Sequence, residues 1–260
     1  MFTYMNDEVK SAARVLDVLE LFTLEPGPLG VSEVAKRLGF PKSSSQGLLT
    51  TLLSRGYLKR EAQGFALPEE LRGGWVGGLR CRLIQAAEPA MRRMAEESGE
   101  SAFIGVLLRD GNIQYLSKIV SANEVRYDAS LSPLRAAHAT SMGLVIMAHL
   151  PEHRVAPLLL PSRLPRITPS TVTDPAVLRQ LLAAAKRNGF AEVQDANVEG
   201  ASGVSAPIFG PNGEVIAALN LGAPSWRYKR ARDRMTSIVR REAAVLSDYF
   251  RDVRTVVDAA

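Results

Sequence analysis

A short polar segment carries the side chains best suited to contact a nucleic acid. The four positions that follow Lys42 are Ser43, Ser44, Ser45 and Gln46. Short hydroxyl side chains let a backbone come close to a groove floor or a phosphate, and a glutamine amide matches the edge of adenine. From Lys36 to Arg60 there are six basic residues and no acidic one. Because a cationic field of this kind attracts phosphates, the segment predicts duplex DNA as a partner.

Two kinds of DNA contact are expected here. The serines and Gln46 are expected near base edges, because groups on the base edges distinguish one sequence from another. The longer cations are expected at phosphates: Lys42, Arg55, Lys59 and Arg60. A helical hairpin with a solvated basic face would have the same composition, so the order of the surrounding elements decides between the two interpretations.

The elements around the segment follow a helix-turn-helix order. Apolar residues recur at helical spacing in residues 31–38, and Gly39 provides the end of that helix. A second helix follows Pro41, with the serines as its caps. Its apolar face consists of Leu48, Leu49, Leu52 and Leu53. The polar segment therefore opens a helix whose opposite face packs into a core.

Flanking segments complete the pattern. Residues 8–22 have an apolar stripe at helical spacing, so they form a helix that packs over the core. Residues 56–67 contain two short extended pieces around a turn at 62–64, which is typical of a wing hairpin. A winged helix-turn-helix domain is thus expected over residues 1–70.

The composition is that of a globular chain with room for two domains. The chain has 260 residues, of which 46% are apolar and 23% are charged, and its net charge is +5. It has no run of about 18 uncharged apolar residues and no signal-peptide pattern at its start, so we expect a cytoplasmic protein with no membrane partner. Residues 226–241 hold seven basic residues against Asp233. This second tract either adds to DNA binding or is the exposed side of the last helix.

The residues do not predict a cofactor, a metal or a catalytic site. The single cysteine, Cys81, excludes an intrachain disulfide and a cysteine-based zinc cluster, and we expect it to be a small helix-packing residue. His149 and His153 lie four apart, but Pro151 separates them and no third ligand is evident. All three histidines precede Ser202, which excludes the order of a hydrolase triad.

The remainder of the chain predicts an α+β domain with an antiparallel sheet covered on one side. Four glycines and a proline in residues 68–78 mark a boundary, and a helix follows at 79–98. Strands are expected at 101–120, joined by a type I′ turn at Asp110-Gly111, and at 125–130, 190–194, 203–209 and 214–221. Helices are expected at 138–150, 152–160, 174–188 and 228–257.

Several ordered motifs resemble those of the IclR family of bacterial transcription regulators over nearly the whole chain. They are the segment from Phe40 to Leu58, His138-Ala-Thr-Ser-Met-Gly143, Gly189-Phe-Ala, Ser205-Ala-Pro-Ile-Phe209 and Gly213-Glu-Val-Ile-Ala-Ala-Leu219. The resemblance implies a winged helix-turn-helix domain (1–70), a linker with its helix (71–98) and a GAF-like α/β effector-binding domain (99–260). It also implies a homodimer or a dimer of dimers on a double-stranded DNA operator.

Candidate effector contacts follow from the residues and from the resemblance. Ser141 and Met142 lie in the first helical turn after His138, where free N–H groups favour a carboxylate. If the strands align as in the family, the same cavity also receives Gly203, Ser205 and Asn220. Arg126 and Arg135 are further candidates for an anionic ligand. For all of them, the alternative is ordinary core packing or, for the arginines, a surface position.

Departures from the family pattern change the expected specificity. Gly47 stands where the family usually has arginine, which removes one DNA contact and weakens the helix. The family usually has lysine where Leu144 stands, aspartate near Val193, cysteine near Gly203, and a Ser-x-Ser pair where Asn220 and Gly222 stand. The resemblance therefore implies a pocket that is roomier and less polar than one for a very small dicarboxylate or keto acid.

The leading hypothesis is a ligand-responsive transcription regulator of a catabolic operon. Its effector is expected to be a small organic or aromatic carboxylic acid that shifts the chain between DNA-competent and incompetent states. Repression and activation stay open. The alternative hypothesis is a metabolite-converting enzyme whose N-terminal module serves oligomerisation or localisation.

Overall fold

The structure, a computed structural model, describes residues 9–24, 27–68, 79–108 and 110–257. The side chains at 79, 81 and 252–257 are outside this description, so the predicted packing of Cys81 is not described. The predicted boundary falls mostly on residues 69–78, which also lie outside it. The internal contacts of the chain separate two compact units, Met1–Leu83 and Ile84–Ala260.

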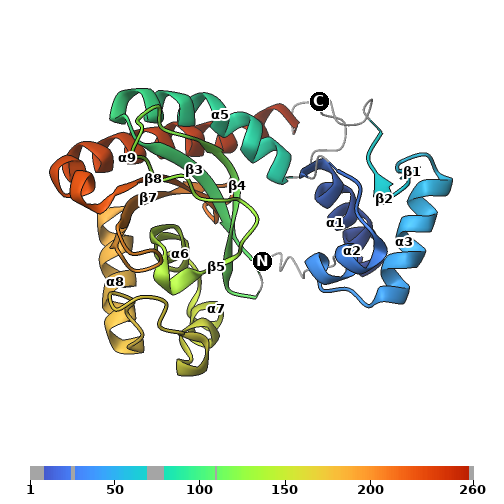
Figure 1. Cartoon of the computed structure of the whole chain (residues 1–260), viewed down its shortest axis with the longest axis horizontal. Coiled ribbons are helices and arrows are strands. Elements are labelled where there is room, and N and C mark those ends of the chain that lie inside the picture. The colour runs from blue at the N-terminus through green and yellow to red at the C-terminus, as the bar shows by residue number, and fades with distance from the viewer. Residues whose placement is uncertain (1–8, 25–26, 69–78, 109, 258–260) are drawn as a thin grey trace. The chain divides into compact units, whose positions relative to one another are not determined.

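The first unit has the predicted winged helix-turn-helix elements (Figure 1). They are α1 (Lys10–Leu24), α2 (Val31–Leu38), α3 (Lys42–Ser54), β1 (Lys59–Glu61) and β2 (Gly64–Ala66). Its core is a single cluster that includes Phe22, Val34, Leu49 and Phe65. Because these residues come from α1, α2, α3 and β2, the cluster holds all three helices and the wing together.

The wing is anchored by one backbone contact that requires glycine. Leu29 and Phe65 exchange two backbone hydrogen bonds of 2.8 and 2.9 Å, which ties β2 to the segment before α2. Gly64 has a φ of 153°, and a side chain there would meet the Leu29 carbonyl. Glycine is therefore the residue that lets the wing lie against the helical core.

The second unit is built on one antiparallel sheet in the order β5-β4-β3-β8-β7-β6. The strands are β3 (Ser101–Leu107), β4 (Asn112–Ile119), β5 (Arg135–Ala136), β6 (Ala191–Gln194), β7 (Ala201–Phe209) and β8 (Val215–Pro224). The long helices are α5 (Leu79–Ser98), α8 (Pro175–Asn188) and α9 (Ser225–Val257). The shorter ones are η1 (Ala137–Ala139), α6 (Ser141–Met147), α7 (Glu152–Val155), η2 (Ala156–Leu159) and η3 (Pro161–Arg163).

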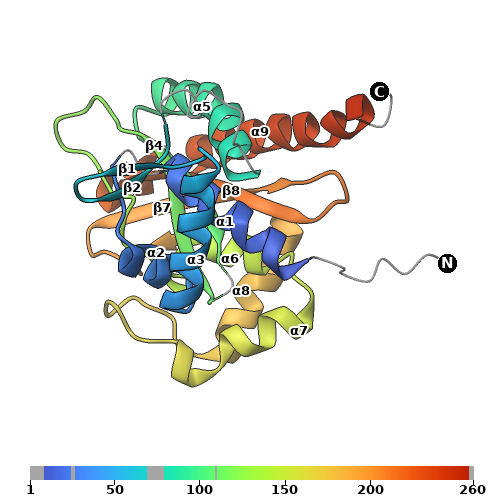
Figure 2. The same cartoon turned by 90° about the vertical axis from the view of Figure 1, so that its right-hand side faces the viewer.

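Helices cover both faces of this sheet, so the expectation of one covered face was wrong. Figures 1 and 2 show α5 and α9 side by side along one face, and Figure 1 shows α6 and α8 on the other. β7 and β8 are buried along almost their whole length. Both strands contain many small residues, mainly alanine and glycine. They therefore lack the alternation of apolar and polar residues that indicates a solvent-exposed face.

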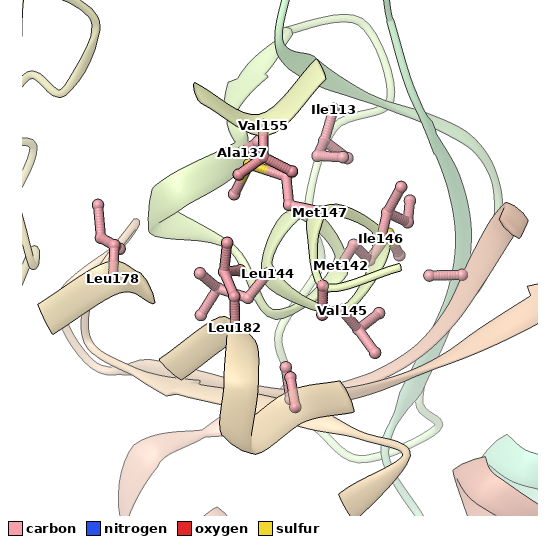
Figure 3. Packing of buried hydrophobic residues seen from close by; sticks show 14 of the residues in the cluster. Ile113, Ala137, Met142, Leu144, Val145, Ile146, Met147, Val155, Leu178 and Leu182 are labelled. Carbon is pink, nitrogen blue, oxygen red and sulfur yellow. The ribbon is translucent and has the colours of Figure 1, made fainter. Parts of the chain in front are cut away.

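The core beside α6 explains why that helix is short and fully buried. Every residue from Ser141 to Met147 is buried. Figure 3 shows α6 side chains among Ile113, Val155, Leu178 and Leu182, which come from β4, α7 and α8. A helix that is apolar all round needs partners on every side, and this unit provides them.

Three local predictions differ from the structure. The turn after β3 is longer than a two-residue type I′ turn, because the Leu108 N–H donates to Asn112 and the Gly111 N–H donates to Leu108. Residues 125–130 form no strand. The helix expected at 138–150 is divided, since Thr140 is extended and its side chain accepts the Gly143 N–H as the N-cap of α6.

Candidate DNA-binding surface and effector pocket

The polar face of α3 is exposed at its N-terminal end. α3 begins at Lys42 with Pro41 as its N-cap, so the serines lie inside the helix and do not cap it as predicted. Lys42, Ser43 and Gln46 are exposed, and Ser44 is half-buried. The Gln46 amide donates to the Thr50 hydroxyl at 3.0 Å, one turn along the helix. These side chains form a solvent-facing polar surface of the kind that enters a groove.

Ser45 is a correction to the predicted base contacts. Its side chain is fully buried, and its hydroxyl donates to the Pro41 carbonyl at 3.2 Å. A residue at this position of α3 lies on the same face as Leu49 and Leu52, one and two turns along, which are also buried. Ser45 therefore stabilises the start of the helix, and its side chain has no access to a base edge.

The cations near α3 differ in how freely they can reach a phosphate. Arg55, Lys59 and Arg60 are all exposed. Lys59 pairs with Glu61 at 3.1 Å, and the Arg60 guanidinium lies over the Phe65 ring at 4.6 Å from its centre. Glu61 lies just outside the acid-free segment 36–60 and pairs with a cation inside it. Both contacts are at the surface, where exchange for a phosphate costs little.

Several arginines of the second basic tract bond to other parts of the second unit. Arg227 pairs with Glu100, Arg232 with Glu192, and Arg241 with Glu97 and Glu242. Arg234 donates to the Glu97 carbonyl. These contacts join α9 to α5, to β6 and to Glu100, which lies between α5 and β3. The tract is therefore largely an exposed side of the last helix, and several of its arginines also bond to neighbouring elements.

A small cavity in the second unit collects several of the predicted effector contacts. It is lined by polar and apolar side chains from β4, β6, β7, β8, the start of α6, the segment before β5 and the loop after β6. Among the predicted residues, Ser141, Gly203 and Asn220 line it. Its volume is about 30 Å³, well below the roughly 300–1,000 Å³ of typical ligand pockets. The roomier pocket expected from the sequence is therefore not the form seen here.

Buried hydroxyl and amide groups form the inner wall of this cavity. The Ser141 and Ser205 hydroxyls are 2.8 Å apart. The Asn220 amide nitrogen lies 3.1 Å from the Ser141 hydroxyl, 3.0 Å from the Ser205 hydroxyl and 3.1 Å from the Val204 carbonyl. Ser205 is fully buried behind the other two and does not line the cavity. We call Ser141, Ser205 and Asn220 the polar triad.

Two tyrosines that the sequence analysis did not identify form another wall. Tyr115 and Tyr127 both line the cavity, and their rings lie 5.3 and 5.8 Å from that of Phe103. Burial raises the pKa of Tyr115, which keeps its hydroxyl protonated. A side chain at Gly222 would come within 2.7 Å of the Tyr127 ring, so glycine there admits the tyrosine. Tyr127 lies in an irregular segment, where the sequence indicated a strand at 125–130.

Three predicted effector contacts lie elsewhere. Met142 is 1% exposed and packs within the α6 core (Figure 3), so it is a core residue. Arg126 is exposed and donates to the Asn123 carbonyl. Arg135 lies over the Tyr115 ring at 4.0 Å and donates to the Pro133 and Ser130 carbonyls. Arg135 therefore supports a wall of the cavity from behind and does not line it.

The outer rim of the cavity is a loop that is fixed at both ends. Asn197 and Val198 line the cavity from this loop, and Val198 is 44% exposed. Asp195 has a φ of 56°, and its carboxylate accepts from the Gly200 N–H at 2.8 Å and from the Ser225 hydroxyl at 2.5 Å. A left-handed conformation at a residue other than glycine persists only where its surroundings hold it. The rim is thus shaped by specific contacts at its base.

Two family models match the chain. A model described as the IclR helix-turn-helix domain matches residues 11–62. A second, described as the bacterial transcriptional regulator IclR C-terminal domain, matches residues 79–248, which is more than half of the chain. The chain belongs to the IclR family of bacterial transcriptional regulators. Its winged helix and its cavity-bearing unit correspond to the two matched parts.

Individual IclR-family relatives agree with this placement. The HTH-type transcriptional regulator BhcR of Paracoccus denitrificans is 31% identical over 227 residues, which cover 86% of this chain and 81% of that protein. The transcriptional repressor IclR of Escherichia coli is 26% identical over 229 residues, which cover 84% and 81%. These relatives are named as regulators, so the chain is a transcriptional regulator and not an enzyme.

A solved structure of an IclR homologue bears on the cavity. It is the crystal structure of a protein from Microbacterium hydrocarbonoxydans in complex with 4-hydroxybenzoate. Its TM-score to this chain is 0.67 at 30% identity, and the match covers 93% of this chain and 99% of that one. A neighbour of the same fold therefore binds a small aromatic acid.

Neither a group of metal-binding side chains nor a helix able to cross a membrane is found among the described residues. Within those ranges, no three histidine, cysteine, aspartate or glutamate side chains are grouped as a metal ion needs. No helix in the same ranges combines the length and the apolar character that a membrane crossing requires.

Proposed function

We propose that this IclR-family chain is a ligand-responsive regulator that acts in the cytoplasm on the operator of a catabolic operon. It binds the operator as a homodimer or a dimer of dimers, with α3 in the major groove and the wing at the phosphates. The observation that supports this most is the exposed polar and cationic end of α3 on a complete winged-helix core. Gln46 reads base edges in this arrangement, and Lys42, Arg55, Lys59 and Arg60 contact phosphates.

We further propose that the effector is a small organic acid, with aromatic acids as the leading class. The cavity in the second unit has aromatic walls, hydroxyl and amide groups, and no charged residue among its lining side chains. The neighbour that binds 4-hydroxybenzoate supports the aromatic class. Because the cavity holds about 30 Å³ here, effector binding requires its walls to move, and this movement is the change that the effector selects.

Fluorescence anisotropy of labelled promoter fragments tests the DNA-binding part. We expect the full chain to prefer a fragment of its own promoter over unrelated DNA of equal length, and to lose affinity steadily as salt is added. Gln46→Ala should lower the preference for the specific fragment by about 1–3 kcal/mol if the amide reads a base. Gln180→Ala, an exposed glutamine on α8, is the matched control. Equal affinity for both fragments in dilute buffer would refute the proposal.

Thermal-shift screening of carboxylic acids, with 4-hydroxybenzoate among them, tests the effector part. An acid that binds the native chain raises its unfolding temperature, and the same acid should alter the anisotropy of the promoter complex. An acid that stabilises the chain and leaves DNA affinity unchanged would count against a regulatory role for the cavity.

A further inference from the structure

The hydrogen-bond polarity of the polar triad can be assigned from its neighbours. One side of the Asn220 amide lies 3.1 Å from the Val204 carbonyl oxygen. A carbonyl oxygen only accepts, so the amide group facing it must be the NH₂. The amide oxygen of Asn220 therefore points away from Val204. It has no partner among the described side chains and backbone groups, and Asn220 lines the cavity.

The triad also leaves one hydroxyl hydrogen free. The Asn220 NH₂ has two hydrogens for the Val204 carbonyl and the two serine oxygens. Ser205 is fully buried, and the acceptor within reach of its own hydrogen is the Ser141 oxygen at 2.8 Å. A buried hydroxyl uses its hydrogen whenever it can. Ser205 thus donates to Ser141, and the hydrogen of Ser141, which lines the cavity, is left to donate into it.

We infer that the inner end of the cavity selects a hydroxyl group on the effector and rejects an ionised carboxylate. The triad presents one donor, from Ser141, beside one acceptor, from Asn220, and a hydroxyl both accepts and donates. A carboxylate only accepts, so one of its oxygens would face the Asn220 oxygen without a hydrogen between them. This inference rests on the proposed function of the cavity as the effector site. Asn220 is then the residue that determines specificity at this end.

The side chains at this end of the cavity carry no charge that would offset that of a carboxylate. No arginine, lysine or histidine is among the residues that line the cavity. The nearest candidate cation, Arg135, does not line the cavity and is engaged by the Pro133 and Ser130 carbonyls, the Tyr115 ring and Tyr127. An acidic group of the effector is therefore oriented outward, toward the rim at Asn197 and Val198, where water reaches it. The effector class is a small hydroxylated acid, with its hydroxyl placed inward.

Isothermal titration calorimetry with matched probes tests this orientation. The first pair is 4-hydroxybenzoate and terephthalate, which exchange a hydroxyl for a carboxylate at one end. The second pair is phenol and benzoate. We expect the hydroxyl member of each pair to bind at least about tenfold more tightly, since the other leaves the Asn220 oxygen unpaired. Equal or tighter binding by terephthalate and benzoate, or no binding by any of the four, would overturn the inference.

Serine variants test the assignment of the free hydrogen. Ser141→Ala should weaken 4-hydroxybenzoate by about three- to tenfold. Ser247→Ala is the matched control, because Ser247 is a buried serine of the same unit that does not line the cavity and donates to the Ala243 carbonyl. It should change the affinity less than about twofold. An equal loss in both variants, with unchanged unfolding temperatures, would contradict the assignment.

Asn220→Ser tests the specificity itself. A serine hydroxyl can rotate to donate or accept, so the fixed acceptor is lost. The preference for 4-hydroxybenzoate over terephthalate should then fall by about tenfold or more. An unchanged preference ratio in a folded variant would overturn the role of Asn220. Promoter binding by the same samples separates this result from the proposed function: if wild-type chain ignores its promoter with and without 4-hydroxybenzoate, the proposed function fails, whatever the ratio.

Discussion

The two units of this chain place their recognition residues in opposite ways. In the winged helix, the proposed DNA contacts lie within residues 42–60, and most of their side chains are exposed. In the second unit, the polar triad comes from α6, β7 and β8, and its members are buried and bonded to one another. A surface that contacts DNA needs one helix whose opposite face packs into a core. A pocket needs several segments brought together, so its recognition groups are also structural groups.

This comparison predicts that polar substitutions cost folding stability in the second unit and binding affinity in the first. The largest effect is expected for Glu100→Gln. Glu100 lies just after α5 and is 2% exposed. It pairs with Arg227 of α9, which is 21% exposed. Removing its charge leaves the arginine without compensation and should lower the free energy of unfolding by about 2–3 kcal/mol.

Chemical denaturation of the full-length variant measures the effect of Glu100→Gln. Glu88→Gln is the control, because Glu88 and Arg92 form an exposed pair one turn apart on α5. Its loss should cost less than about 0.5 kcal/mol. If the two variants unfold alike, buried charge in the second unit does not carry the stability that the comparison assigns to it.

Gly47→Ala should stabilise the winged helix by about 0.5–1 kcal/mol. Gly47 lies in the middle of α3, and an added methyl group meets no atom within 4 Å. Alanine restricts the unfolded chain more than glycine does and favours the helix. Hydrogen exchange of α3 peptides, read by mass spectrometry, should slow, while α6 peptides stay unchanged. Slower exchange in both units would show that their stabilities are coupled.

Lys42→Ala should weaken operator binding several-fold without changing stability. If Lys42 contacts one phosphate, the slope of log affinity against log salt should become smaller by about 0.9. Ser45→Ala is the contrasting variant within the same helix: its side chain is buried, so the salt slope should stay as it is. An altered slope in Ser45→Ala would mean that α3 begins differently on DNA.

The smallest effect is expected from the histidines, which all lie in the second unit. Burial lowers the pKa of His149, whose Nε2 atom has no hydrogen-bond partner among the described groups, and burial also lowers that of His138. The unfolded chain then binds more protons below pH 6.5, so stability is full above this value and declines as the pH falls. The winged helix has no histidine.

Hydrogen exchange at pH 7.5 and 5.5, corrected for intrinsic rates, separates the two units. His149→Leu should reduce the decline in α6 peptides, whereas His153→Gln, an exposed neighbour, should not. An equal decline in α3 peptides would assign the acid sensitivity to groups other than these histidines.

Much of the fold was predictable because its signals are local. The helices 79–98 and 174–188 and the wing turn were found from periodicity, from glycine ends and, at Asp174, from a cap that the structure confirms. Several wrong site assignments share one origin. Ser45, Met142 and Arg135 were assigned by residue type, but burial decided their roles, and burial depends on distant segments. Tyr127 was missed because the alternation in residues 125–130 indicated a strand, whereas the segment is irregular and packing against Phe103 and Gly222 sets the position of the ring.

By itself, the sequence determined the family, the order of the elements and the surface that we propose faces DNA, since each depends on residues that are close in the chain. The tertiary structure alone decided which polar groups meet inside the second unit. Antiparallel pairing of β7 and β8 sets Ser205 opposite Asn220, and α6 packs Ser141 against both. Hydrogen-bond polarity at that meeting point follows from which groups are already satisfied, and no stretch of sequence contains that information.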